Sequence, residues 1–297
     1  DYPLIESWGE ANDHWIRVAQ EVGGDAILKA IAEAGLSVAD VDALYFVTVT
    51  GVATPSIDAR LVNRLGLPPT VKRVPIFGLG CLAGAAGVAR AADYLKGHPN
   101  EVAVLLSVEL CSLTLQREDL SVENLIASGL FGDGAAAVVL AGAERGSSGP
   151  RVVDSRSSFY SNTERVMGWD VSERGFKVVL SAEVPDMVRR HLRSDVDAFL
   201  AGHGLERSDV TVWISHPGGP RVLEAMQESL ELPEGALAGA WRTLREVGNL
   251  SSTSVLLVLG EVLASPPPPG SWGLISAMGP GFCSELVLLR WDAAFDG

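Results

Sequence analysis

Basic residues are scarce in this chain. Its 23 Lys and Arg stand against 37 Asp and Glu, which gives a formal net charge of -14 and a sequence pI near 4.8. Proteins that bind nucleic acid carry basic patches, so this balance argues against nucleic acid as a partner. No apolar run approaches the ~18 residues of a membrane span, and no basic segment precedes an apolar one as in a signal peptide. We therefore expect no membrane partner.

Cysteine is also rare. The three cysteines, Cys81, Cys111 and Cys283, are widely spaced, and no CxxC pair occurs. Disulfide frameworks and zinc sites need closely spaced cysteines, so neither is predicted. The pattern indicates reduced thiols in the cytoplasm. Nothing in the sequence calls for a metal or a redox cofactor.

Apolar residues are abundant. Hydrophobic residues make up 47% of the 297 positions and the mean hydropathy is +0.23, enough for a large core. The length predicts about two domains or one large duplicated domain. Strands are expected at residues 41–50, 71–77, 102–108, 135–140, 151–160, 210–215, 272–278 and 284–291. Helices are expected at residues 14–35, 55–66, 81–95, 185–202, 220–230, 236–247 and 254–263.

This alternation predicts an α/β fold with mainly parallel central strands. The elements fall into two halves that share an order, separated by a polar, Gly/Ser-rich connection at residues 141–150. The helix after Cys81 corresponds to the helix after Asn249. The end of the strand at 41–50 corresponds to the end of the strand that precedes His216.

The strongest local signal lies at residues 74–90. An apolar, strand-like run ends in Gly78-x-Gly80, Cys81 follows, and an Ala/Gly-rich helical segment continues to about Leu95. Cys81 is thus placed at a helix N-terminus, where backbone N–H groups and the helix dipole favour the nucleophilic thiolate. A lone cysteine is more often a buried structural residue, so its partners decide the interpretation.

Two partners are present. His216 follows the apolar run at 210–215 and opens the tight turn His216-Pro217-Gly218-Gly219-Pro220. Asn249 lies just before the apolar helical run that starts at Ser254. A cysteine, a histidine and an asparagine at the ends of elements form a constellation typical of nucleophilic catalysis.

Five motifs in this order resemble the signatures of type III polyketide synthases, the chalcone synthase-like family, and the bacterial members more than the plant ones. The resemblance covers about residues 41–289. The motifs are Gly80-Cys81-Leu82-Ala83-Gly84, Leu130-Phe131-Gly132-Asp133-Gly134-Ala135-Ala136-Ala137, His216-Pro217-Gly218-Gly219-Pro220, Gly248-Asn249-Leu250-Ser251-Ser252 and Met278-Gly279-Pro280-Gly281.

The resemblance implies a thiolase-like α/β fold, with two pseudo-duplicated βαβαβ halves in a layered αβαβα architecture. The first half, residues 1–145, would carry Cys81, and the second, residues 146–297, would carry His216 and Asn249. Family members have a further strand, and basic residues that hold the coenzyme A phosphates, ahead of the helix expected at 14–35. Neither is identified in this sequence, so no phosphate-binding residue is assigned. We expect a chain that truly lacked that strand to lose stability.

The resemblance also implies the chemistry. Cys81 would capture an acyl group from an acyl-CoA as a thioester, and His216 would pair with the thiol and keep it ionised. Asn249 and His216 would stabilise the enolate formed when malonyl-CoA loses carbon dioxide. Repeated condensation and cyclisation would yield a small pyrone or phenol. Family members are homodimers, and we expect the same here.

Further residues are predicted to line the substrate cavity from the family register. Phe131 matches a phenylalanine that guards the path from the coenzyme A tunnel, and Val178 takes the place of a second one, which would open the entrance. Trp169 replaces a glycine of the plant enzymes and would fill part of the cavity, which favours an aliphatic starter and a short product such as an alkyl pyrone. The other lining candidates are Thr54, Cys111, Thr114 and the turn Gly279-Pro280-Gly281.

Three alternatives are open at this point. A ketoacyl-carrier-protein synthase III shares the fold and the Cys, His and Asn, but resembles His-Gln-Ala-Asn at the histidine. A dinucleotide-dependent oxidoreductase is suggested by Gly78-x-Gly80-x-x-Ala83, with Glu109 at the end of the next strand. That pattern is weak by itself and leaves His216 and Asn249 unexplained. A non-catalytic binding protein would require an unreactive Cys81.

Overall fold

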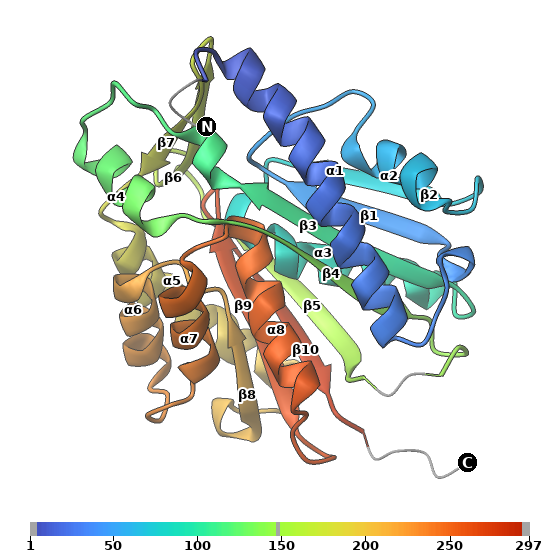
Figure 1. Ribbon diagram of the computed structural model, residues 1–297. Coiled ribbons are helices and arrows are strands. Elements are labelled where there is room, and N and C mark those ends of the chain that lie inside the picture. The colour runs from blue at the N-terminus through green and yellow to red at the C-terminus, as the bar shows by residue number, and fades with distance from the viewer. Residues whose placement is uncertain (1–4, 147–148, 293–297) are drawn as a thin grey trace.

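The computed structural model describes residues 5–146 and 149–292 (Figure 1). In the first half the order is α1 (Trp8–Glu33), β1 (Ala43–Thr48), α2 (Ile57–Leu65), β2 (Lys72–Phe77), η3 (Gly80–Leu82), α3 (Ala83–Gly97), β3 (Val102–Leu110), η4 (Cys111–Thr114), α4 (Val122–Leu130) and β4 (Asp133–Ala141). In the second half it is β5 (Arg151–Phe159), β6 (Met167–Ser172), β7 (Gly175–Leu180), α5 (Val184–Ala201), β8 (Val210–Ser215), α6 (Pro220–Leu230), α7 (Ala238–Val247), η6 (Ser251–Thr253), α8 (Ser254–Ala264), β9 (Trp272–Gly279) and β10 (Cys283–Arg290). All eight strands expected from the sequence are present, with bounds within two residues.

The strands form two four-stranded sheets and a separate hairpin. The sheet orders are β2-β1-β3-β4 and β5-β10-β9-β8, and β6 pairs with β7. Each sheet contains a parallel pair, β1/β3 or β8/β9, followed by an antiparallel neighbour, β4 or β10. This shared pattern supports the predicted duplication.

The expectation of mainly parallel central strands holds for strand direction, since three of the four strands in each sheet run the same way and only β4 and β10 are reversed. The two sheets contain three parallel pairings, β1/β2, β1/β3 and β8/β9, and three antiparallel pairings, β3/β4, β9/β10 and β5/β10. The last strand of each half turns back on its predecessor, and only a short turn at residues 280–282 joins β9 to β10. A connection that short permits only an antiparallel neighbour.

The helices lie in layers around the sheets. Helices α3 and α8 pack against each other and contact both sheets, so they form the middle layer (Figure 1). Helix α1 crosses the outer face of the first sheet, and a separate apolar cluster lies beneath it. Helices α5 and α6 pack together and join the core of the second sheet. The layered αβαβα architecture is thereby confirmed.

Three elements differ from the sequence-based expectations. Helix α1 begins at Trp8 rather than near His14, because the Ser7 hydroxyl caps it by accepting a hydrogen bond from the Glu10 backbone N–H at 3.2 Å. Helix α4 and the β6–β7 hairpin were not predicted. Helix α4 is nine residues long and leaves Leu125 and Ile126 exposed, so no buried stripe marks it.

The turns that open α3 and α8 each pack on the opposite half. Turn η3 contacts β9, and turn η6 contacts β3. The close approach requires glycine at Gly84, where a Cβ atom would lie 2.2 Å from the Ser252 carbonyl oxygen. This crosswise packing brings the predicted catalytic residues of the two halves together. No helix in the described ranges is long and apolar enough to cross a membrane.

Candidate active site

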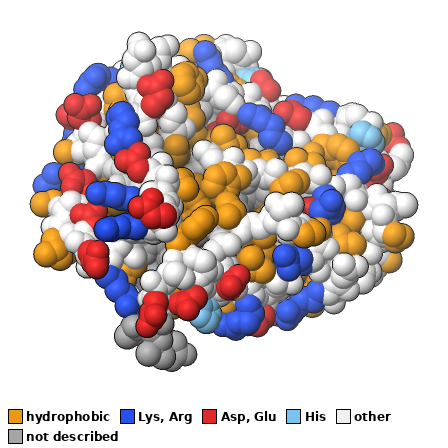
Figure 2. Space-filling model, turned by 90° about the horizontal axis from the view of Figure 1, so that it is seen from above, with side chains coloured by type: hydrophobic (Ala, Val, Ile, Leu, Met, Phe, Trp, Pro, Cys, Tyr) orange, Lys and Arg blue, Asp and Glu red, His pale blue; other side chains and the backbone are white. Residues whose placement is uncertain are grey.

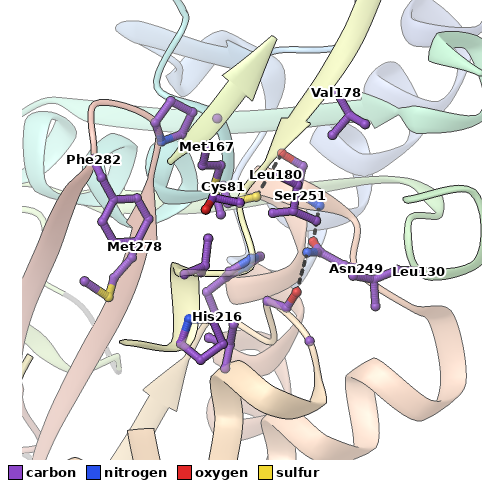
Figure 3. A pocket seen from close by; sticks show the side chains of 18 of the residues that line it. Cys81, Leu130, Met167, Val178, Leu180, His216, Asn249, Ser251, Met278 and Phe282 are labelled. Atoms are coloured by element: carbon purple, nitrogen blue, oxygen red, sulfur yellow. Dashed lines mark hydrogen bonds between the residues drawn. The ribbon is translucent and has the colours of Figure 1, made fainter. Parts of the chain in front are cut away.

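A cavity of about 670 Å³ lies where the two halves meet and contains all three predicted catalytic residues, Cys81, His216 and Asn249. Its walls are mostly apolar. Figure 2 looks onto the end of the molecule that carries α4 and the β6–β7 hairpin, and hydrophobic side chains gather in the middle of this face. Figure 3 shows Cys81 between Met278 and Phe282 on one side and Leu130 and Val178 on the other.

Cys81 lies in turn η3, directly before α3, as predicted. Gly80 has a φ of +54°, and a Cβ atom there would lie 2.5 Å from the ring of Pro280, so the turn needs glycine. The Cys81 thiol is 6% exposed and donates a hydrogen bond to the Ser251 hydroxyl at 3.7 Å. Burial raises its pKa to about 11, against the smaller lowering effect of the Ser251 hydrogen bond.

His216 follows β8, and its backbone N–H extends the β8–β9 ladder by donating to the Ser276 carbonyl at 2.9 Å. The imidazole is 5% exposed, and neither ring nitrogen has a hydrogen-bond partner within the described part of the chain. Burial lowers its pKa to about 4, so the ring is neutral at pH 7. A buried imidazole that faces a cavity without partners is free to bond a ligand.

The resting site therefore differs from the predicted thiolate–imidazolium pair. A thiol pKa near 11 and an imidazole pKa near 4 both favour the neutral forms. The thiol's hydrogen bond goes to Ser251 rather than to His216. His216, being neutral, is available as a proton acceptor for the thiol.

Asn249 is held in one orientation. Its Oδ1 accepts from the Ser251 backbone N–H at 2.8 Å, and its Nδ2 donates to the Gly218 carbonyl at 3.1 Å (Figure 3). An amide carries two Nδ2 hydrogens, so the second can bond a substrate oxygen. The motif around Phe131 supports this arrangement, because the Asn249 backbone N–H donates to the Leu130 carbonyl at 2.9 Å and the Gly132 N–H to the Asn249 carbonyl at 3.0 Å.

The structure brings some of the predicted lining residues to the cavity and not others. Phe131, Trp169, Val178 and Pro280 line it together with the three catalytic candidates. Trp169 is paired across the hairpin with Val178, and its ring lies 6.0 Å from that of Phe176. The cavity lining does not include Thr54, Cys111, Thr114, Gly279 or Gly281.

These five residues have other surroundings. Thr54 is exposed ahead of Pro55, and Cys111 is buried in η4, where its carbonyl accepts from the Thr114 hydroxyl at 2.7 Å. Gly279 packs against the cysteine turn, since a Cβ atom there would lie 2.8 Å from the Leu79 carbonyl oxygen. A Cβ atom on Gly281 would lie 3.1 Å from the ring of Phe159.

Sequence reasoning missed two features of the site. Ser251 bonds both Cys81 and Asn249, and its position two residues after Asn249 was the available signal. The other feature is a wall of apolar side chains from α5, α6, β9 and the residue that follows the Gly-Pro-Gly turn. Its members are Val184, Val188, Leu192, Met226, Met278 and Phe282. In sequence these residues are indistinguishable from core positions.

The alternative of a dinucleotide-dependent oxidoreductase finds no support in the geometry around Gly80 and Glu109. Pro280 packs against Gly80, the glycine of the Gly78-x-Gly80-x-x-Ala83 pattern that would face a pyrophosphate, and Glu109 is completely buried rather than free for a ribose. Across residues 5–146 and 149–292, no three His, Cys, Asp or Glu side chains cluster in a way that would hold a metal ion.

The raised pKa of the Cys81 thiol predicts a pH dependence of its alkylation. Only the thiolate reacts, so without substrate the rate with iodoacetamide should rise about tenfold per pH unit from about pH 7 to about pH 10. The reaction is followed by intact mass, with a small free thiol as the control, which should level off near its own lower pKa. A rate that levels off below about pH 8 would instead indicate a thiolate stabilised by His216.

The fold and the site define a condensing enzyme of the thiolase-like class, with cysteine, histidine and asparagine at the junction of two related halves. Within that class the chain belongs to the chalcone and stilbene synthase family, and it is a type III polyketide synthase. The family's N-terminal domain matches residues 10–144, and its C-terminal domain matches residues 151–291.

Several relatives are similar over most of the chain. A 1,3,6,8-tetrahydroxynaphthalene synthase from Streptomyces peucetius is 54% identical over 98% of this chain and 78% of its own length. A putative chalcone synthase from Bacillus subtilis is 44% identical over 85% of this chain and 71% of its own length. The solved 1,3,6,8-tetrahydroxynaphthalene synthase of Streptomyces coelicolor superposes with a TM-score of 0.93 at 34% identity, covering 97% of this chain and 82% of that one.

Proposed function

We propose that this enzyme is an acyltransferase that condenses malonyl-CoA units with an acyl group held on Cys81. The observation that carries the proposal is the convergence of Cys81, His216 and Asn249 on one largely apolar cavity, where neither ring nitrogen of His216 has a partner among the described residues. The substrates are acyl-CoA and malonyl-CoA thioesters. The residues present need no further cofactor for this chemistry.

The first step loads the starter. The Cys81 thiol gives its proton to neutral His216 as the sulfur attacks the carbonyl carbon of the acyl-CoA. The new carbon–sulfur bond forms, the bond to coenzyme A breaks, and the departing thiolate takes the proton back from His216. Ser251 accepts a hydrogen bond from the resting thiol and orients it.

The second step extends the chain. Malonyl-CoA loses carbon dioxide, and the free Nδ2 hydrogen of Asn249 and a ring N–H of His216 stabilise the enolate oxygen. The enolate carbon attacks the Cys81 thioester, a carbon–carbon bond forms, and the Cys81 thiolate is released. The product is longer by two carbons and is reloaded until it cyclises.

Two products are considered. The 54% identical relative supports 1,3,6,8-tetrahydroxynaphthalene, whose alternating oxygens fit a chain built only from malonyl units. A short alkyl pyrone from an aliphatic starter is the second candidate. It is supported by Trp169, which occupies part of the cavity wall beside Phe176 and limits room for an aromatic starter.

Product mass separates the two candidates. The enzyme is incubated with malonyl-CoA alone and with a series of linear acyl-CoA starters, and the products are identified by liquid chromatography and mass spectrometry. A naphthalene product from malonyl-CoA alone is expected if no other starter is used. Products whose masses increase with the starter would favour the pyrone, and no product from any mixture would contradict the proposed function.

We also propose a homodimer. The outer edge of β2 has no neighbouring strand among the described residues, and Phe77 at its end is 51% exposed. Sheet edges and exposed aromatic side chains are features that subunit contacts commonly cover.

A further inference from the structure

We propose that Glu109 is a positioning residue that holds the turn carrying Asn249 and Ser251 in place across the boundary between the two halves. The inference rests on the proposed function, because it concerns the residues that would stabilise the enolate. Glu109 is the penultimate residue of β3 and is 0% exposed. It does not line the cavity, so it acts through other residues.

One carboxylate oxygen of Glu109 binds its own half. Oε2 accepts from the Val49 backbone N–H at 3.1 Å, the Thr50 hydroxyl at 2.8 Å and the Thr48 hydroxyl at 3.3 Å. These three donors lie at the end of β1 and just beyond it. Oε2 therefore fixes the carboxylate firmly within the first sheet.

The other oxygen binds the second half. Oε1 accepts from the Ser252 hydroxyl at 2.5 Å. The Ser107 hydroxyl, also on β3, lies 2.8 Å from that of Ser252 and 2.7 Å from that of Thr253. Two side chains of β3, Glu109 and Ser107, thus hold turn η6. The residues that supply the hydroxyls, Ser107, Ser252 and Thr253, are fully buried.

Burying a carboxyl group in such a network costs folding free energy. Burial raises the pKa of the Glu109 carboxyl to about 7, although its hydrogen bonds oppose the shift. Well-packed apolar residues often replace buried charged groups without loss of stability, so packing alone does not call for a carboxylate here. A fully satisfied buried network does fix one geometry, which is what a catalytic turn needs.

Few contacts separate Glu109 from the predicted catalytic residues Cys81 and Asn249. Ser252 is covalently joined to Ser251, which receives the Cys81 thiol's hydrogen bond and donates its own N–H to Asn249 Oδ1. A displacement of Ser252 therefore moves the amide that would face the enolate oxygen. Misplacing a catalytic group by about 1 Å can cost on the order of 10²-fold in rate.

The test compares three variants in malonyl-CoA decarboxylation. Ser252→Ala removes the hydrogen bonds of Ser252 to Glu109 and Ser107 across the boundary but leaves the Ser107–Thr253 bond. Glu109→Gln is isosteric but lacks the second accepting oxygen. Thr48→Val is the matched control, because it removes a bond to the same carboxylate within the first half. We expect the first two to lower kcat about tenfold with KM changed less than about twofold, and the control to stay within about twofold of wild type.

Two further readouts separate positioning from loss of fold. Thermal melting checks that the variants are folded. If Ser252→Ala does not fold, the test rests on Glu109→Gln. Acylation of Cys81, followed by intact mass, should persist in both. An unchanged kcat in folded Ser252→Ala and Glu109→Gln, or an equal loss in Thr48→Val, would overturn the inference. A wild-type enzyme that does not decarboxylate malonyl-CoA would instead overturn the proposed function and this inference with it.

Discussion

Cys81→Ala is expected to abolish product formation, with a loss of at least about 10³-fold, because removal of an enzymatic nucleophile commonly costs that much or more. The covalent acyl adduct on the protein should disappear with it. Alanine fits the site, since Cys81 is small and buried and the change removes only the thiol, which donates to Ser251. The loss should therefore come from chemistry rather than unfolding.

The same variant should keep a partial reaction. His216 and Asn249 are intact in Cys81→Ala, so malonyl-CoA should still lose carbon dioxide, and protonation of the enolate would give acetyl-CoA. Intact mass reports the adduct, and chromatography of the thioesters reports decarboxylation.

Cys283→Ala is the matched control for Cys81→Ala. Cys283 is partly exposed, lies outside the cavity lining, and has its sulfur 3.1 Å from the Pro280 carbonyl oxygen. Its removal should leave both the adduct and the product near wild-type levels. An adduct that survives in Cys81→Ala but is lost in Cys283→Ala would show that Cys283, and not Cys81, is the nucleophile.

Much of the fold could be predicted because periodicity reports burial directly. The runs at 210–215 and 272–278 are mostly apolar, and the structure buries most of their residues between layers as β8 and β9. Sheet direction could not be predicted in the same way. An apolar run reads alike in both directions, and only the short turn at residues 280–282 indicates that β10 runs antiparallel to β9.

The catalytic residues were predictable for a different reason. Cys81, His216 and Asn249 each lie beside glycines that a tight turn or a close approach requires, so their surroundings leave a mark in the sequence. The apolar residues of the cavity wall have no such sequence signal. Leu192 and Met226 differ from core residues only in facing empty space, and which face of α5 or α6 does so depends on how the two halves pack.

The protonation state could not be predicted either. A helix N-terminus favours a thiolate, and that local effect was the basis for the expected ion pair. In the folded protein the desolvation of Cys81 and His216 is the largest influence on both groups and acts in the opposite direction. Burial of this kind arises from contacts between the two halves, which a local motif does not encode.

Asn249→Asp is expected to reduce malonyl-CoA decarboxylation by about 10²- to 10³-fold, the usual cost of removing one oxyanion donor. The change is isosteric, and one carboxylate oxygen can still accept the Ser251 N–H. The other oxygen takes the place of Nδ2, where it faces the Gly218 carbonyl and would repel the enolate oxygen rather than bond it. The retained bond to Ser251 should keep the turn folded, while the side chain at position 249 repels the enolate oxygen instead of stabilising it.

Starter loading separates this effect from general damage. Acylation of Cys81 depends on the thiol and His216, so Asn249→Asp should still form the acyl adduct from a starter acyl-CoA, as seen by intact mass. His216→Ala should impair both steps, because His216 accepts the thiol proton and also donates to the enolate oxygen. Equal loss of loading and decarboxylation in Asn249→Asp would mean that Asn249 shapes the whole site. Loss of decarboxylation alone would place Asn249 at the enolate oxygen, which is the role that its fixed amide and free Nδ2 hydrogen suit.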